Sequence, residues 1–150
     1  MSLVTELQAE RDACVRRINS QKSKIKNCER AYETLRTFKQ CVERSKAGFD
    51  SVNSEKQKVL SAVSEISDTC RSAKKYAGGM GNTLSGIGAR VVGVTYDALI
   101  LSIGLKMSAY VSAIDEYERE IGFLESRLSQ LDYDIKAAKQ AETLLSTTGR

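Results

Sequence analysis

The 150-residue sequence contains no proline, no tryptophan and no histidine. Without proline, a long helix meets no residue that must break it. Without histidine, the chain lacks the commonest general base and the commonest transition-metal ligand, which counts against an enzyme. We therefore expect a non-catalytic protein with no catalytic residue, no cofactor and no metal site.

Cysteine is scarce, with four residues in the chain and no C-x-x-C pair that would indicate a zinc site. They are Cys14, Cys28, Cys41 and Cys70. Along one helix, neighbours in this set lie roughly 20 Å or more apart, too far for a disulfide. We expect small buried hydrophobic residues in a reducing compartment, and the N-terminus has no apolar signal-peptide core.

The net charge of +4 is unevenly distributed. Residues 1–75 hold 16 Lys+Arg and 10 Asp+Glu, or +6, whereas residues 76–150 hold 7 and 9, or −2. Halves of opposite sign suit a chain that folds back on itself, whereas a nucleic-acid-binding protein more often concentrates its charge in one patch. We therefore expect no nucleic-acid partner.

Apolar residues recur at heptad spacing in the first half of the chain, which predicts a helix over roughly 5–75. After Leu35 the second heptad row shifts by three residues instead of four and continues through Phe38, Val52 and Val59, which predicts a stammer. The pattern leaves open whether this helix is continuous or breaks near Gly48.

The second half repeats the heptad pattern and predicts a helix over roughly 87–146. One row holds Ile114, Ile121, Leu128 and Ile135, and the other holds Tyr117, Leu124, Leu131, Ala138 and Leu145. Acidic residues around Glu118 interleave with these rows, either as a solvated face or as a match for the basic first helix. The predicted fold is a single all-α domain, an elongated antiparallel helical hairpin with coiled-coil packing.

Five of the ten glycines lie in residues 76–88, four of them between the two predicted helices and Gly88 at the start of the second. Gly81 and Gly86 have the glycine spacing of a phosphate-binding loop, but Ile87 and Gly88 replace its lysine and hydroxyl residue. No predicted strand precedes the segment, as a dinucleotide-binding loop would require. We therefore interpret residues 76–86 as a glycine-rich turn without a nucleotide.

Residues 91–105 are apolar on nearly every face of the predicted helix. A hairpin seam leaves five large side chains unexplained, and these are Val91, Val94, Leu99, Leu101 and Leu105. Exposing them would cost several kcal/mol at about 25 cal/mol per Å². A stable membrane span is disfavoured because the segment is short and contains Asp97. We favour a partner helix from another chain; the other interpretation is that a broken first helix returns to cover this segment.

The mid-chain sequence Tyr76-Ala77-Gly78 between two long antiparallel helices resembles the WXG superfamily of type VII secretion. Members are helical hairpins with a Trp-x-Gly turn, and here tyrosine stands in place of tryptophan. In length and heptad-rich flanks the chain is similar to the helical accessory proteins of LXG toxins in Gram-positive bacteria. The resemblance implies that Tyr76 and Gly78 form the turn, with the aromatic ring packing at the hairpin tip.

The same resemblance implies a function and partners. Such accessory proteins are targeting factors or chaperones that bind the helical N-terminal domain of an LXG toxin, beside a second small WXG-like protein, and aid its export. It implies a hetero-oligomer assembled in the cytoplasm, exported with its partner or retained. No tyrosine starts a Tyr-x-x-x-Asp/Glu export signal. The alternative function is a self-associating structural coiled-coil protein.

Overall fold

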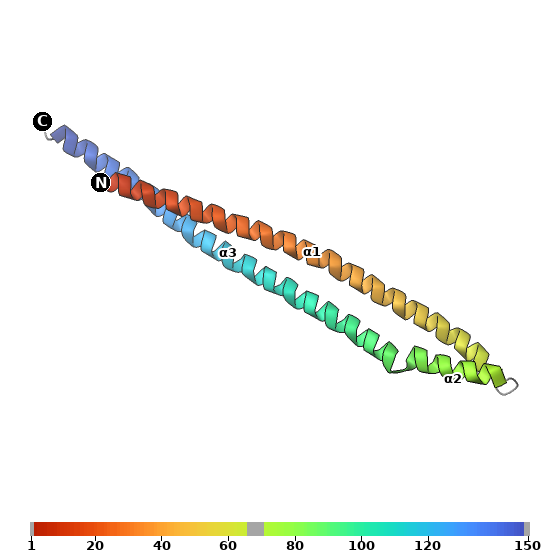
Figure 1. The fold of residues 1–150 in the computed structure, drawn as a ribbon. Coiled ribbons are helices and arrows are strands. Elements are labelled where there is room, and N and C mark those ends of the chain that lie inside the picture. The colour runs from red at the N-terminus through yellow and green to blue at the C-terminus, as the bar shows by residue number, and fades with distance from the viewer. Residues whose placement is uncertain (1, 66–70, 149–150) are drawn as a thin grey trace. The chain divides into compact units, whose positions relative to one another are not determined.

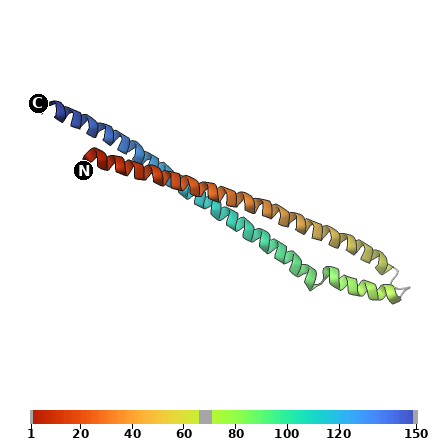
Figure 2. The same cartoon turned by 45° about the horizontal axis from the view of Figure 1, so that its top comes forward.

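In the computed structural model, the described residues are 2–65 and 71–148, and they form three helices. These are α1 (Leu3–Glu65), α2 (Arg71–Ser85) and α3 (Ile87–Thr148). No strand occurs within this described part of the chain. Figures 1 and 2 both show α1 alongside α3 with the chain direction reversed. The predicted all-α antiparallel helical hairpin is therefore confirmed.

The first helix is continuous through Gly48, so the break considered there does not occur. A single glycine inside a helix costs only about 1 kcal/mol relative to alanine, which flanking packing can offset. Val42 is buried on one side of Gly48 and Phe49 is half-buried on the other. The helix begins at Leu3 because the Ser2 hydroxyl oxygen accepts a hydrogen bond from the Thr5 backbone N–H at 3.2 Å.

The glycine-rich segment is not the turn of the hairpin, and that prediction is wrong. Residues 71–85 form α2, so Tyr76 and Gly78 lie within a helix, and the Tyr76 side chain is 47% exposed. The first helix ends at Glu65 instead of residue 75, and the connection to α2, residues 66–70, lies outside the described residues. Ala73 and Leu84 of α2 are buried, and this packing offsets the low helix propensity of the glycines.

The break between α2 and α3 falls on Gly86 alone. The Arg90 backbone N–H donates to the Gly86 carbonyl oxygen at 3.3 Å, which opens α3. A Cβ at residue 86 would overlap the carbonyl oxygen of Asn82 and lie 3.1 Å from its carbonyl carbon. Glycine is therefore required at this bend because the chain approaches its own backbone too closely for any side chain.

The chain divides into two compact units, and each is described by itself. The first unit comprises Met1–Tyr32 and Ala109–Arg150, and the second comprises Glu33–Ser108.

The core of the first unit is a single heptad seam between α1 and α3. Its buried residues are Cys14, Ile18, Ile121, Leu124 and Leu131, and Leu7, Ile25 and Leu128 pack against them. The Cys14 thiol donates to the Leu124 carbonyl oxygen at 3.2 Å. Gln21 is also buried, and its Oε1 has no hydrogen-bond partner among the described residues. The seam ends before Leu145, which is 72% exposed although the heptad pattern places it in the seam.

Ion pairs on both sides of this seam fix its antiparallel register. Arg11 Nε donates to Asp132 Oδ1 at 2.5 Å, and Arg127 Nη2 donates to Glu10 Oε1 at 2.6 Å. Arg17 lies 3.6 Å from Glu120. Glu120, which belongs to the acidic residues around Glu118, thus meets a basic residue of α1, as one of the two interpretations predicted, and so does Asp132. In the third pair the charges are reversed, with Arg127 on α3 and Glu10 on α1. The pairs are exposed, so they select the register more than they add stability.

The predicted stammer in α1 is wrong. In the second unit the row that contains Tyr32 continues at regular seven-residue intervals through Lys39, Lys46, Asn53 and Leu60, which are all partly buried. Phe38, Val52 and Val59 are instead 48%, 54% and 57% exposed. The seam accepts these polar residues because Lys46 and Asn53 have specific partners across it, Asp97 and the Leu84 carbonyl oxygen.

Glycine-to-alanine changes should have opposite effects at residues 78 and 86. Gly78→Ala fills open space within a helix, so the free energy of unfolding should rise by about 0.5–1 kcal/mol. Gly86→Ala forces the backbone apart at Asn82 and should therefore lower the free energy of unfolding. Thermal unfolding followed by circular dichroism measures both, and stabilisation by Gly86→Ala would refute the steric account of the bend.

Candidate interaction surface

The five side chains that the sequence left without a hairpin partner are all exposed. Their exposed fractions are 56% for Val91, 67% for Val94, 39% for Leu99, 64% for Leu101 and 65% for Leu105. The interpretation that a broken α1 covers them is wrong, because α1 is continuous through Gly48 and leaves them uncovered.

Four of the five lie on one face of α3. Val91, Val94, Leu101 and Leu105 share this face with exposed Ala98, and the successive spacings are three, four, three and four residues. We call this set the outer stripe. It lies opposite Ile103, which is 5% exposed and faces α1. A 3–4 spacing is that of a coiled-coil seam, so α3 carries a second seam on the side away from α1.

Leu99 does not belong to the outer stripe. At 100° per residue it lies roughly a third of a turn away from the stripe. Its lower exposed fraction of 39% matches that of Val92, 38%, and both residues flank the buried face. From the sequence, Leu99 was grouped with the other four because the heptad pattern shows only that it lies outside the seam between α1 and α3. The pattern does not show on which other face of the helix it lies.

A polar contact holds α3 against α1 behind the outer stripe. Lys46 Nζ of α1 donates to Asp97 Oδ1 at 2.5 Å, and this hydrogen bond and charge raise the pKa of Lys46. A raised lysine pKa contributes stability below its unfolded-state value, so the contribution is present at neutral pH and is lost only at strongly alkaline pH. Nearby, the rings of Phe49 and Tyr96 lie 6.2 Å apart. These contacts orient α3 so that the stripe faces solvent.

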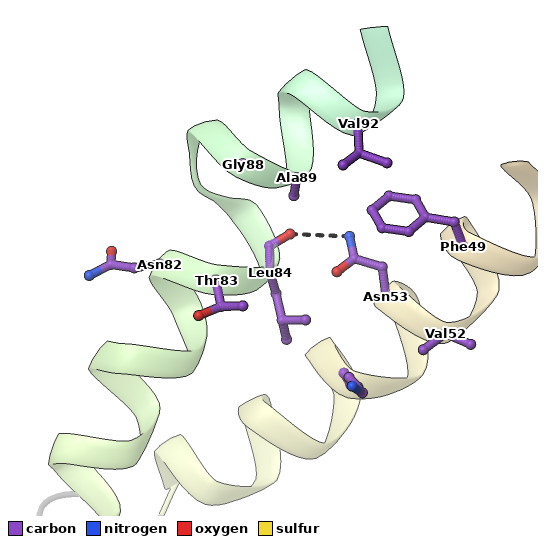
Figure 3. Close-up of a pocket in the computed structure, with 10 residues that line it drawn as sticks. Phe49, Val52, Asn53, Asn82, Thr83, Leu84, Gly88, Ala89 and Val92 are labelled. Atoms are coloured by element: carbon purple, nitrogen blue, oxygen red, sulfur yellow. Dashed lines mark hydrogen bonds between the residues drawn. The ribbon is translucent and has the colours of Figure 1, made fainter. Parts of the chain in front are cut away.

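Beside the bend lies a second, smaller apolar feature, a groove of about 500 Å³ (Figure 3). We call it the bend groove. Its apolar walls include Phe49 and Val52 of α1, Leu84 of α2 and Val92 of α3, and its polar lining includes Asn53. Lys56 and Thr83 also line it, and its volume is large enough to accommodate a side chain of a partner.

Asn53 joins α1 to the end of α2 in this groove. Its Nδ2 donates to the Leu84 carbonyl oxygen at 3.1 Å, as the dashed line in Figure 3 marks. Because α2 ends at Ser85, the Leu84 carbonyl cannot accept the usual hydrogen bond from four residues further along an unbroken helix. This role was not predicted from the sequence, where its one signal is an asparagine at a heptad seam position.

The cysteines form no disulfide among the described residues. Cys14 is buried, Cys28 is partly buried and Cys41 is exposed, so the expectation of buried thiols is wrong for Cys41. Cys70 lies outside the described residues. Within the described ranges, no group of three or more Cys, Asp and Glu residues is placed to hold a metal ion.

The segment Arg71–Thr148 is long and apolar enough to cross a membrane by length and composition alone. Its 18-residue window has a mean hydropathy of 1.4, and 6% of that window is buried. Asp97 interrupts the apolar residues of α3 and is paired with Lys46 of α1. Insertion would separate this pair or carry it into lipid, at a cost of several kcal/mol.

Asn53→Ala should destabilise the protein by about 1 kcal/mol, because it leaves the partly buried Leu84 carbonyl without a donor. Asn82→Ala is the matched control, since Asn82 is exposed on α2 and the change brings the same gain in helix propensity. Chemical denaturation measures both variants. Equal midpoints would contradict the assigned role of Asn53.

No known protein family, curated protein or solved structure matches this chain.

Proposed function

We propose that this protein is a non-catalytic helical adaptor that binds a helix of another protein along the outer stripe. The observation that carries the proposal is the second heptad seam on α3, whose four large side chains are each more than half exposed. Covering a valine or leucine side chain contributes roughly 1.5–3 kcal/mol, so one partner helix along this stripe gains several kcal/mol. Helix-in-groove docking uses this i, i+3, i+7 pattern of anchors.

The resemblance to LXG accessory proteins suggests which protein the partner is. We propose that the adaptor binds the helical N-terminal domain of an LXG toxin in the cytoplasm, beside a second small WXG-like protein, and helps direct the toxin to a type VII secretion system. The antiparallel hairpin and its uncovered heptad seam support this proposal, since both suit a helical bundle completed by another chain. Because Tyr76 and Gly78 lie within α2, the three-residue turn motif adds nothing to it.

Leu101→Glu should lower the affinity for the partner by about tenfold or more, because it places a charge in the centre of the proposed interface. Helical content and thermal unfolding should not change, since Leu101 is 64% exposed in the isolated chain. Co-purification with an LXG-type protein encoded beside this one, followed by calorimetry of the complex, measures the effect.

Leu144→Glu is the matched control, because Leu144 is 65% exposed and belongs to the first unit. It should bind the LXG-type domain as the unmodified protein does. Absence of any complex with that domain would refute the proposed partner. Unfolding of Leu101→Glu would show instead that the outer stripe belongs to the core of the protein.

Self-association through the same stripe is the second candidate function. The stripe is symmetric about Ala98, because an antiparallel copy would place Val91 against Leu105 and Val94 close to Leu101. Light scattering on the purified chain distinguishes the two candidates. A dimer that Leu101→Glu converts to a monomer supports self-association, and a strictly monomeric mass removes it.

A further inference from the structure

Two segments of opposite charge lie on either side of the outer stripe in the sequence. Residues 71–90, which we call the basic segment, have no acidic residue and four cations, namely Arg71, Lys74, Lys75 and Arg90. Residues 115–125, which we call the acidic segment, have one cation, Arg119, and five acidic residues, namely Asp115, Glu116, Glu118, Glu120 and Glu125. The net charges are therefore +4 (4 − 0) and −4 (1 − 5).

Cations of α2 face away from α1, as the outer stripe of α3 does. Ala73 and Leu84 are the buried residues of α2, and the Leu84 carbonyl oxygen accepts a hydrogen bond from Asn53 of α1. At 100° per residue, Arg71 and Lys75 lie on the face of α2 opposite to this buried face. Both are exposed, and neither forms an ion pair with a described residue. The second unit thus presents a basic face and then an apolar stripe along the side away from α1.

The acidic segment continues the outer stripe along the same helix, because α3 is unbroken from Ile87 to Thr148. At heptad intervals Asp115 continues a row of the stripe itself, and Glu118 and Glu125 continue the row of Asp97, which flanks the stripe. These three acidic side chains are exposed and form no ion pair with a described residue. Arg119 also lies on this face, where the acidic residues outnumber it.

An antiparallel second copy centred on Ala98 brings the two segments together. Arg71 lies 27 residues before Ala98 (98 − 71), and Glu125 lies 27 residues after it (125 − 98). Lys75 lies 23 residues before Ala98 (98 − 75), and Glu118 lies 20 residues after it (118 − 98). The acidic segment of each copy is therefore level with α2 of the other, and the contact forms twice about the two-fold axis of an isologous dimer.

The bend between α2 and α3 limits how closely these charges approach. Figure 1 shows that α2 is tilted from the axis of α3, so the long side chains of Arg71 and Lys75 must span part of the gap. Charges attract one another over about 10 Å at 0.1 M salt. The complementary segments therefore select the direction of the second copy, and the outer stripe supplies the apolar contact.

Charges near the two-fold axis are compatible with this arrangement. Asp97 flanks the centre of the stripe, and in each copy it is already paired with Lys46 at 2.5 Å. Arg90 flanks the stripe, whereas Lys106 shares the row of Leu99 and lies off the stripe, so these two cations do not face each other. A parallel copy in register would instead place basic against basic segment and acidic against acidic segment, which disfavours that pairing.

We infer that the outer stripe is covered by an antiparallel second copy of this chain, whose direction is selected by contact between the basic segment of each copy and the acidic segment of the other. This inference rests on self-association, the second candidate function, and adds the direction of the second copy and the charges that select it. A helix of another protein then reaches the stripe by displacing the second copy.

Two charge-reversed variants of the full chain test the inference. Arg71→Glu, Lys75→Glu makes the exposed face of α2 acidic, and Glu118→Lys, Glu125→Lys makes the acidic segment basic. In an antiparallel homodimer of either variant, like charges meet at both contacts, so the dissociation constant of the dimer should rise roughly tenfold. Sedimentation equilibrium at low salt measures this constant, and the difference from the unmodified chain should shrink as salt rises.

An equimolar mixture of the two variants should recover the dimer. In the mixed dimer the acidic α2 of one variant meets the basic helix of the other, and the second contact joins two unreversed segments. The matched control is Arg44→Glu, Lys58→Glu, which reverses two exposed cations of α1 and should leave the dissociation constant unchanged. Circular dichroism of each variant checks that the helical content is retained.

The remaining outcomes each overturn the inference. A chain that is monomeric at every concentration would exclude the second copy and leave the adaptor proposal standing. A dimer that neither reversal weakens, or that the control weakens equally, would show that these charges do not select the arrangement. Weakening by both reversals without recovery in the mixture would show that the two segments do not meet. Absence of a complex with an LXG-type domain would refute only the proposed toxin partner.

Discussion

Two paired helices can bury only one face of each helix, and this constraint governs the whole structure. In α3 the buried face is a heptad seam made of two rows, with Ile103 and Leu131 in one row and Ile121 in the other. Any further apolar row on the same helix must stay exposed unless another chain covers it. The outer stripe is such a row, and its exposure follows from the geometry of a hairpin and not from poor packing.

The polar residues in the seam show how the hairpin holds its register despite weak apolar packing in the second unit. Lys46 meets Asp97, and Asn53 meets the Leu84 carbonyl oxygen, so both helices are held where the apolar seam is interrupted. In the first unit the register depends instead on a continuous apolar core with ion pairs beside it. Gln21 is the exception, because its buried Oε1 has no hydrogen-bond partner in the part of the chain that the structure describes. Buried polar groups of this kind favour one register over others at a cost in stability.

The glycine-rich segment illustrates how packing can override local propensity. Its glycines disfavour a helix, yet α2 forms because Ala73 and Leu84 are buried and no proline forces an end. The bend is confined to Gly86, where the chain lies too close to Asn82 for a Cβ. This bend, together with the Lys46–Asp97 contact behind it, sets where the exposed surface of α3 begins and which way it faces.

The sequence by itself determined that the chain is an all-α hairpin, because heptad spacing without proline leaves few other folds. It also showed that residues 91–105 carry more apolar side chains than a hairpin seam can bury. A hairpin buries one face of this helix, and five large apolar side chains lie outside that face. The tertiary structure decided which side chains share a face. It separated Leu99 from the outer stripe, moved Phe38, Val52 and Val59 out of the seam, and placed Tyr76 and Gly78 within a helix. These outcomes depend on contacts between residues that are distant in the sequence, such as Asn53 with Leu84. The spacing of residues within one helix does not report the energies of such contacts.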